Sequence, residues 1–294
     1  MNEKDYLLLK TLEKERTLSR AAEKLYLSQP ALSYRLQTLE KETGAKLLNR
    51  SRRGATLTPA GEFLLIKLAQ MNRELQQTRE QIRAMSGSIA GILRLGISSV
   101  FAHYDLPQLM KSFHEKYPEV EFQVKTGVSA QIQRMLQEGE IHIGILRTDY
   151  GWAGNRTLLK TEPICLAASK PLTFEELLHY PQIRYATDGA LQTLIDHWWA
   201  ERFSSPPRTA MEVDSMDTCR ELVRAGLGWA ILPAIGLQGQ VAYQQPLFNH
   251  QNQPLQRCTW LMIEPMAENL PSAQAFQKFL VNQFNSTNSH EQNK

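Results

Sequence analysis

Cysteine is scarce in this chain of 294 residues. The three cysteines, Cys165, Cys219 and Cys258, stand far apart, and no two of them form a Cys-x-x-Cys pair. This spacing argues against a zinc site, and so low a cysteine content in a chain of this size argues against a disulfide framework. We therefore expect no bound metal, and we expect each cysteine to be a small buried residue and not a redox sensor.

Several other signals are absent. No apolar run is long enough to span a bilayer, and the N-terminus lacks a signal-peptide pattern, so we expect a cytoplasmic protein with no membrane partner. Neither a P-loop nor a dinucleotide fingerprint occurs, and we expect no cofactor. Ser98, Ser99, His103 and Asp105 stand close together, but a catalytic triad needs geometry, not sequence proximity, and no nucleophile elbow is present. We expect a protein that is not an enzyme.

Charge is distributed unevenly along the chain. Residues 1–86 hold 16 Lys and Arg against 10 Asp and Glu, a net charge of +6. The remainder holds 17 against 20, a net charge of −3, so the overall +3 hides a basic head and a slightly acidic body. A basic head gains sequence-independent affinity for DNA by releasing counterions from the phosphates.

The sequence of the head predicts three short helices. Asn2 can cap a first helix that runs to about residue 16, and either Thr17 or Ser19 can cap a second one. Ser28 is a suitable cap for a third helix, with a proline in its first turn, and Gly44 can end that helix. Leucines at i, i+4 and i+7 form the buried face of the third helix: Leu32, Leu36 and Leu39.

The opposite face of the third helix is polar and suits the major groove of DNA. The segment LLNRSRRGATLTP follows, in which three arginines flank Gly54 between two short β-prone pieces, and this pattern predicts a basic wing. The predicted DNA contacts are Arg20, Ser28, Gln29, Pro30, Ser33, Tyr34, Arg35, Gln37, Arg50, Arg52 and Arg53. The alternative is a three-helix packing module that does not contact DNA; the polar face, the arginine turn and the charge asymmetry favour DNA binding.

A long helix is predicted after the wing, from Pro59 to about residue 86. Its apolar residues recur in alternating steps of four and three, which is a heptad seam that needs a partner helix. The seam consists of Leu64, Leu68, Met71, Leu75, Thr78, Ile82 and Met85. We expect it to pair with a second copy of the chain, the alternative being packing against the chain's own body. Gly87 and Gly91 end the helix and predict a hinge.

The remaining 200 or so residues alternate between strand and helix patterns. Strands are predicted at 91–99, 120–127 and 141–147, with helices at 106–113 and from Ser129 to about Gly139, which is the order of parallel βαβ units. The pattern restarts at about Ile164, with strands near 183 and 209–213, helices at 190–203 and 215–225, and a strand at 228–233. The polar tail from Asn282 is expected to fray. Two α/β lobes in series predict a cleft between them.

In such folds ligands sit where strands end and helices begin, and hydroxyls, helix-end N–H groups and an arginine favour an anion there. The predicted effector residues are Ser98, Ser99, His103, Thr126, Gly127, Ser129, Arg147, Thr187, Gly189 and Arg257. Asp214 and Ser215 precede a further helix. Alternatively, each Ser or Thr caps a helix, His103 is structural, and Arg147 is a solvated charge at a strand end.

The head contains a long ordered motif: Ala21-Ala22, Ser28-Gln29-Pro30-Ala31-Leu32-Ser33, Leu39-Glu40, Gly44, Leu47, Arg50 and Leu57-Thr58-Pro59-Ala60-Gly61. With this motif it resembles the N-terminal domain of LysR-type transcriptional regulators. The length of the chain and its later segments also fit this family, so the resemblance covers nearly the whole chain. One departure stands out: many members carry a basic residue directly after Ser33, where this chain has Tyr34 followed by Arg35.

The resemblance implies a fold and a division into domains. An all-α winged helix-turn-helix head is expected at 1–58, a dimerising linker helix at 59–87, and an α/β effector domain like the periplasmic solute-binding proteins at 88–294. Its first lobe would comprise about 91–161 and 267–288, and its second about 162–266, with a C-terminal helix near 271–284 rejoining the first lobe. Two copies or four are expected to bind double-stranded DNA.

The resemblance also bears on the effector. Residues 91–147 are similar to those of catabolite control protein C, a citrate-responsive member, and this implies a small anionic effector, a carboxylate such as citrate. By this likeness Ser98, Ser129, Arg147 and Arg257 are carboxylate contacts. The expected function is a ligand-responsive transcriptional regulator; the alternatives are an enzyme or a solute-binding domain tethered to a DNA-binding head.

Overall fold

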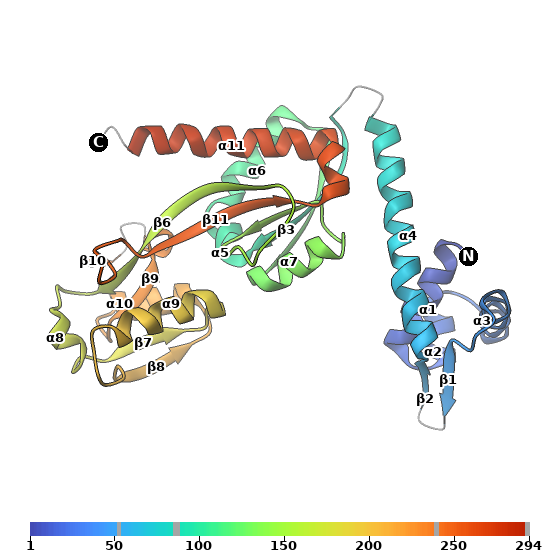
Figure 1. The fold of residues 1–294 in the computed structure, drawn as a ribbon, viewed down its shortest axis with the longest axis horizontal. Coiled ribbons are helices and arrows are strands. Elements are labelled where there is room, and N and C mark those ends of the chain that lie inside the picture. The colour runs from blue at the N-terminus through green and yellow to red at the C-terminus, as the bar shows by residue number, and fades with distance from the viewer. Residues whose placement is uncertain (52–53, 85–88, 238–240, 292–294) are drawn as a thin grey trace. The chain divides into compact units, whose positions relative to one another are not determined.

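The computed structural model describes residues 1–51, 54–84, 89–237 and 241–291. They form two compact units, Met1–Met85 and Ser86–Lys294 (Figure 1). In these ranges no helix is long and apolar enough to cross a membrane.

The first unit is a bundle of helices with a two-stranded wing. Its elements are α1 (Glu3–Glu15), α2 (Leu18–Lys24), α3 (Gln29–Thr43), β1 (Leu48–Ser51), β2 (Gly54–Leu57) and α4 (Pro59–Ala84). Asn2, Thr17 and Ser28 cap the first three helices as predicted. Gly44 ends α3 with φ +67°, a left-handed conformation that glycine adopts without steric cost. The strands β1 and β2 pair antiparallel.

The core of this unit is built from the predicted leucines. Leu32, Leu36 and Leu39 are fully buried, and they pack with leucines of α1 and with Leu68 of α4. Gly61 has no room for a side chain, because an added Cβ would lie 2.3 Å from the carbonyl oxygen of Leu47. The first turn of α4 is therefore pressed against the start of the wing.

Helix α4 changes character along its length. Its first half carries buried side chains, whereas Met71, Leu75 and Ile82 are 52%, 45% and 61% exposed. These three residues belong to the predicted heptad seam. Within its own unit the second half of the seam is thus left uncovered, while Met85 lies outside the described residues.

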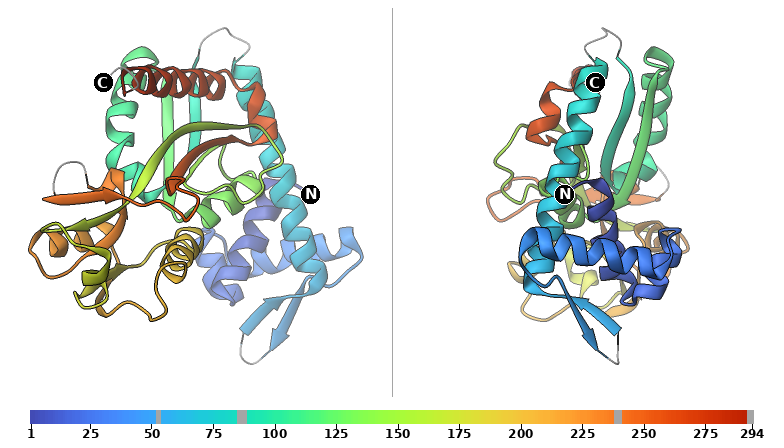
Figure 2. Two further views of the ribbon diagram at one scale, coloured as in Figure 1. Left: turned by 60° about the vertical axis from the view of Figure 1, so that its left-hand side comes forward. Right: turned by 90° about the vertical axis from the view of Figure 1, so that its right-hand side faces the viewer.

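The second unit has two α/β lobes, and the first matches the predicted strand–helix–strand order. It contains β3 (Gly91–Ser98), α5 (Ser99–Tyr104), α6 (Leu106–Lys116), β4 (Val120–Gly127), α7 (Ser129–Gln137), β5 (Ile143–Leu146) and α11 (Pro271–Glu291). β4 and β5 both pair with β3 in parallel. α11 packs on this lobe (Figure 2). The rings of Phe276 and Phe113 lie 5.0 Å apart. α11 continues through Asn282, the start of the tail that was expected to fray, as far as Glu291.

The second lobe also combines strands and helices. It contains α8 (Phe174–Leu177), β7 (Gln182–Tyr185), α9 (Gly189–Ala200), β8 (Thr209–Val213), α10 (Met216–Arg224), β9 (Ala230–Pro233), the 3-10 turn η1 (Ala234–Gly236) and β10 (Tyr243–Pro246). β7 and β8 are parallel. Trp198, Trp199 and Trp229 form its aromatic core, with Trp199 stacked on Trp229 at 5.5 Å.

Two long antiparallel strands, β6 (Arg156–Ala168) and β11 (Gln256–Ile263), connect the lobes (Figure 1). β6 pairs with β11 in its first half and with β9 and β10 in its second. The start predicted near Ile164 was therefore too late. β11 pairs with β5 from Trp260 onward, so the chain returns to the first lobe earlier than the predicted position of about 267. η2 (Pro265–Asn269) then leads into α11.

Candidate functional site

A cavity of about 500 Å³ lies in the second unit, lined by residues of both lobes. Four helices begin at its wall: their N-caps are Ser98 for α5, Val128 for α7, Asp188 for α9 and Ser215 for α10. The first N–H groups of a helix have no partner inside it and carry partial positive charge. Four such ends around one space favour an anionic occupant.

Arg147 is the most buried cation of this cavity. It follows β5, is 4% exposed, and forms an ion pair with Glu162 of β6. The other oxygen of Glu162 accepts the backbone N–H of Ile235 at 2.9 Å. The Nη1 atom of Arg147 is buried and has no hydrogen-bond partner among the described residues. This guanidinium is therefore held in place from one side, with donor capacity left over on another.

A second guanidinium, from Arg257 of β11, lines the same cavity and forms an ion pair with Asp188, the cap of α9. Arg257 lies on a strand that leads back to the first lobe, and Asp188 lies on a helix of the second lobe. This pair therefore connects the two lobes. Burial, together with the positive charge of Arg257, lowers the pKa of Arg147 to about 10. Arg147 thus remains a cation at neutral pH, but one that a bound anion would stabilise.

A polar contact bridges the two lobes at the cavity wall. The hydroxyl of Tyr104 in α5 donates to Asp217 of α10 at 2.5 Å, and Arg220 donates to the same hydroxyl at 2.8 Å. Burial, together with the hydrogen bond to Asp217 and its negative charge, raises the pKa of Tyr104 to about 12. Because the phenol and its partners come from different lobes, this contact favours the lobe arrangement seen in the structure.

Most of the predicted effector residues are brought together. The cavity is lined by Ser98, Ser99, His103, Gly127, Ser129, Arg147, Thr187 and Arg257, and also by Asp214 and Ser215. Thr126 and Gly189 do not line it. Thr126 is exposed one residue before the end of β4, on the other side of the pleat from its neighbour Gly127. Gly189 is exposed and has no side chain to reach inward.

α7 begins at Ser129 as predicted, but the alternative role of Ser129 as a helix cap is wrong, since Val128 holds the N-cap position. The hydroxyl of Ser129 instead accepts the backbone N–H of Arg147 at 3.0 Å and so fixes the end of β5. Sequence reasoning missed Glu162 and Tyr104, and it picked Thr187 and Gly189 on either side of Asp188 without giving Asp188 itself a role. A capping pattern could have found Asp188, but no local signal places Glu162 beside Arg147, because the pairing depends on the path of β6.

The predicted DNA-binding residues lie on one unit. Most are exposed: Arg20, Ser28, Gln29, Pro30, Tyr34, Gln37 and Arg50, with Ser33 half-buried. Arg35 is held by Asp5, a fully buried carboxylate that accepts from its Nε and Nη2 atoms at 2.6 Å. Of the two residues after Ser33, Tyr34 is therefore the one presented to solvent, at 73% exposure. Arg52 and Arg53 lie outside the described residues.

Both units match known sequence families. Residues 4–62 match the family described as bacterial regulatory helix-turn-helix protein, lysR family, and residues 86–285 match the LysR substrate binding domain. The chain belongs to the LysR family. Members of this family are transcriptional regulators that bind DNA and respond to small-molecule effectors, and they are not enzymes.

Individual relatives agree with this assignment. The chain is 40% identical over 281 residues to the uncharacterized HTH-type transcriptional regulator YraN of Bacillus subtilis, covering 95% of this chain and 97% of that protein. It is 36% identical over 272 residues to YkuM of the same organism, covering 92% and 93%. The full-length structure of an OxyR variant from Pseudomonas aeruginosa superposes with a TM-score of 0.64 at 23% identity, covering 97% and 94%. This LysR regulator thus has the family fold along nearly its whole length.

Proposed function

We propose that this LysR regulator senses a small carboxylate in the cavity between its lobes and thereby changes how it binds DNA. One observation carries the proposal: Arg147 lines a cavity bordered by the N-termini of α7, α9 and α10, and its buried Nη1 atom has no hydrogen-bond partner in the described part of the chain. A planar guanidinium with donors to spare can hold a carboxylate through two parallel hydrogen bonds. The volume of about 500 Å³ suits a small metabolite.

The two ion pairs at the cavity give such a ligand a way to act. A carboxylate that takes up part of the Arg147 guanidinium competes with Glu162, which is tied to the second lobe through Ile235. Arg257 and Asp188 likewise link the two lobes. A ligand shifts the equilibrium between two lobe arrangements only if its affinity for them differs. These ion pairs would be the source of that difference in affinity.

The DNA-binding part of the proposal rests on the face of α3. Gln29, Pro30, Tyr34 and Gln37 would contact bases, while Arg20 and Arg50 would contact the backbone. A second copy would bind through the exposed part of α4, where Met71, Leu75 and Ile82 form an apolar stripe. Pairing of two heads would match two half-sites on DNA.

Binding of the effector is tested by isothermal titration of the full-length protein with citrate and with a panel of other organic acids. We expect at least one carboxylate to bind, and Arg147→Lys to weaken it roughly tenfold or more, because lysine keeps the charge opposite Glu162 but loses the planar fork. Citrate is the first compound of the panel; failure of citrate alone would redirect the search to another acid.

The matched control is Arg156→Lys. Arg156 lies on the same connecting strand as Glu162, pairs with Asp149 and is 44% exposed, but it does not line the cavity. The control variant should bind the carboxylate as the wild type does. Unchanged affinity in Arg147→Lys, or binding of no carboxylate at all, would contradict the proposed anion site.

A further inference from the structure

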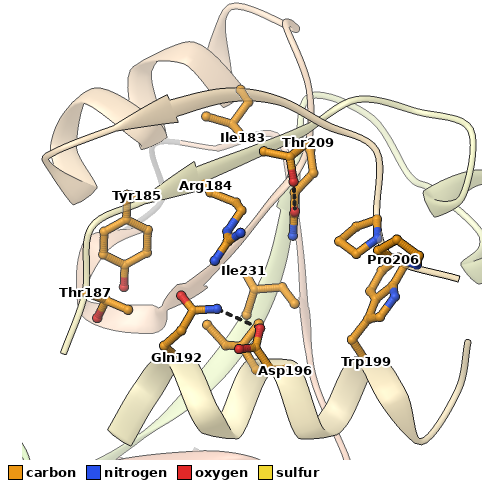
Figure 3. Close-up of a pocket in the computed structure, with 13 residues that line it drawn as sticks. Ile183, Arg184, Tyr185, Thr187, Gln192, Asp196, Trp199, Pro206, Thr209 and Ile231 are labelled. Atoms are coloured by element: carbon orange, nitrogen blue, oxygen red, sulfur yellow. Dashed lines mark hydrogen bonds between the residues drawn. The ribbon is translucent and has the colours of Figure 1, made fainter. Parts of the chain in front are cut away.

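A second cavity, of about 330 Å³, lies in the second lobe between α9 and the strands β7 and β8 (Figure 3). Its floor is apolar and rigid: Ile183 and Ile231 are buried, and Trp199 stacks on Trp229 while its indole N–H donates to the carbonyl of Ser205 at 2.8 Å. Pro206 adds to the wall. The size is at the small end of ligand cavities.

The polar side chains of this cavity carry opposite charges on opposite walls. Arg184 extends from β7 toward α9, and Asp196 rises from α9 beside Gln192, which donates to it at 2.7 Å (Figure 3). Within the described part of the chain, the ion pair of Arg184 is a 3.8 Å contact with Glu212, and no salt bridge joins it to Asp196. A cation and an anion thus face one apolar floor without neutralising each other.

One flank of α9 borders the cavity. Gln192, Ile195, Asp196 and Trp199 stand at i, i+3, i+4 and i+7 and so share this flank, beside the buried side chains of Leu191 and Trp198. Asp196 is exposed and Gln192 is half-buried, so the acid and the amide lie at the open side of the cavity, where a ligand can meet them.

We propose that this cavity binds a free amino acid with an apolar side chain. Its carboxylate would meet Arg184, its ammonium would meet Asp196, and its side chain would lie on Trp199 and Ile231. A ligand with only one charge pairs with only one of the two charged side chains of the wall. The other side chain loses hydration without gaining a partner, and this lowers the affinity of the ligand. A zwitterion satisfies both walls, and the apolar floor selects its side chain.

The two cavities share part of their walls. Tyr185 and Thr187 line both, and α9 carries Asp188, the partner of Arg257, at its start. An amino acid bound against the flank of α9 would therefore contact the same helix whose N-terminal end lines the larger cavity. Binding in the second cavity, however, does not depend on the function proposed for the first.

The test is isothermal titration of the full-length protein with L-leucine and L-phenylalanine, with isocaproate and isoamylamine as analogues of leucine that lack one charge each. We expect an amino acid to bind, and each analogue to bind roughly tenfold more weakly or worse. Arg184→Gln and Asp196→Asn should each weaken leucine by a similar factor. Arg224→Gln, which removes an exposed cation of α10 away from the cavity, should leave the affinity unchanged.

Three results would overturn the proposal. The first is that neither amino acid binds the wild type at millimolar concentration. The second is that isocaproate binds as tightly as leucine. The third is that leucine binding survives in the double variant of Arg184 and Asp196. Arg147→Lys separates the two sites: it should leave leucine affinity unchanged, and loss of leucine binding in this variant alone would place the amino acid in the larger cavity. Thermal melting of each variant, monitored by circular dichroism, checks that it folds.

Discussion

The pair of Arg147 and Glu162 gives a prediction about stability that is separate from ligand binding. Arg147 is 4% and Glu162 8% exposed, and removal of one partner leaves an uncompensated buried charge. Such a loss costs about 3–5 kcal/mol. Glu162→Gln should fall at the lower end, about 3 kcal/mol, because the amide oxygen can still accept the N–H of Ile235. Replacing both partners, as Arg147→Met with Glu162→Gln, should cost less than the two single changes together.

Urea unfolding of the full-length protein, followed by tryptophan fluorescence, measures this loss. The five tryptophans all belong to the second unit, so the signal reports that unit without interference from the head: Trp152, Trp198, Trp199, Trp229 and Trp260. The same variant should bind the carboxylate more tightly, because Glu162 no longer competes for the guanidinium or repels the ligand. A loss below about 1 kcal/mol for Glu162→Gln, the scale of an exposed pair, would refute the reasoning.

Three further predictions concern the rest of the chain. Leu75→Glu should convert the protein from dimer to monomer in light scattering and abolish operator binding; a monodisperse dimer would contradict the role of the α4 seam. Tyr26 has φ +56° after α2, so Tyr26→Gly should raise the stability of the head by roughly 1 kcal/mol in thermal melting, and a lowered melting temperature would argue otherwise. The folded pKa of Tyr104, about 12, lies above its unfolded value of 10.0. Its contribution is therefore complete below pH 10.0 and lost as pH rises through about 12, and Tyr104→Phe should show a smaller loss of stability over that window.

The elements that sequence reasoning located best are those with local signals. The Ser28 cap followed by Pro30 and the Gly44 stop depend on residues within one turn, and each was confirmed. The cavity was also located, since Ser98 and Arg147 stand where strands end and the ends of parallel strands meet at one edge of a sheet.

What sequence reasoning could not find depends on contacts between distant segments. The first half of β6 is only partly apolar, and its pairing with β11 joins segments far apart in the chain. The ion pairs of Arg147 and Arg257 follow from that pairing. Arg35 shows the same limit in the head: its neighbour Asp5 comes from another helix, and only the fold reveals that the two meet.

The central claim is that a carboxylate in the cavity between the lobes changes DNA binding. It is tested most directly by DNase footprinting on the DNA upstream of the protein's own gene, with and without the bound carboxylate, for the wild type and for Arg147→Lys. The account predicts that the ligand alters the wild-type footprint, and that the variant binds the same DNA but needs roughly tenfold more ligand or fails to respond. A footprint that responds equally in both proteins would contradict it.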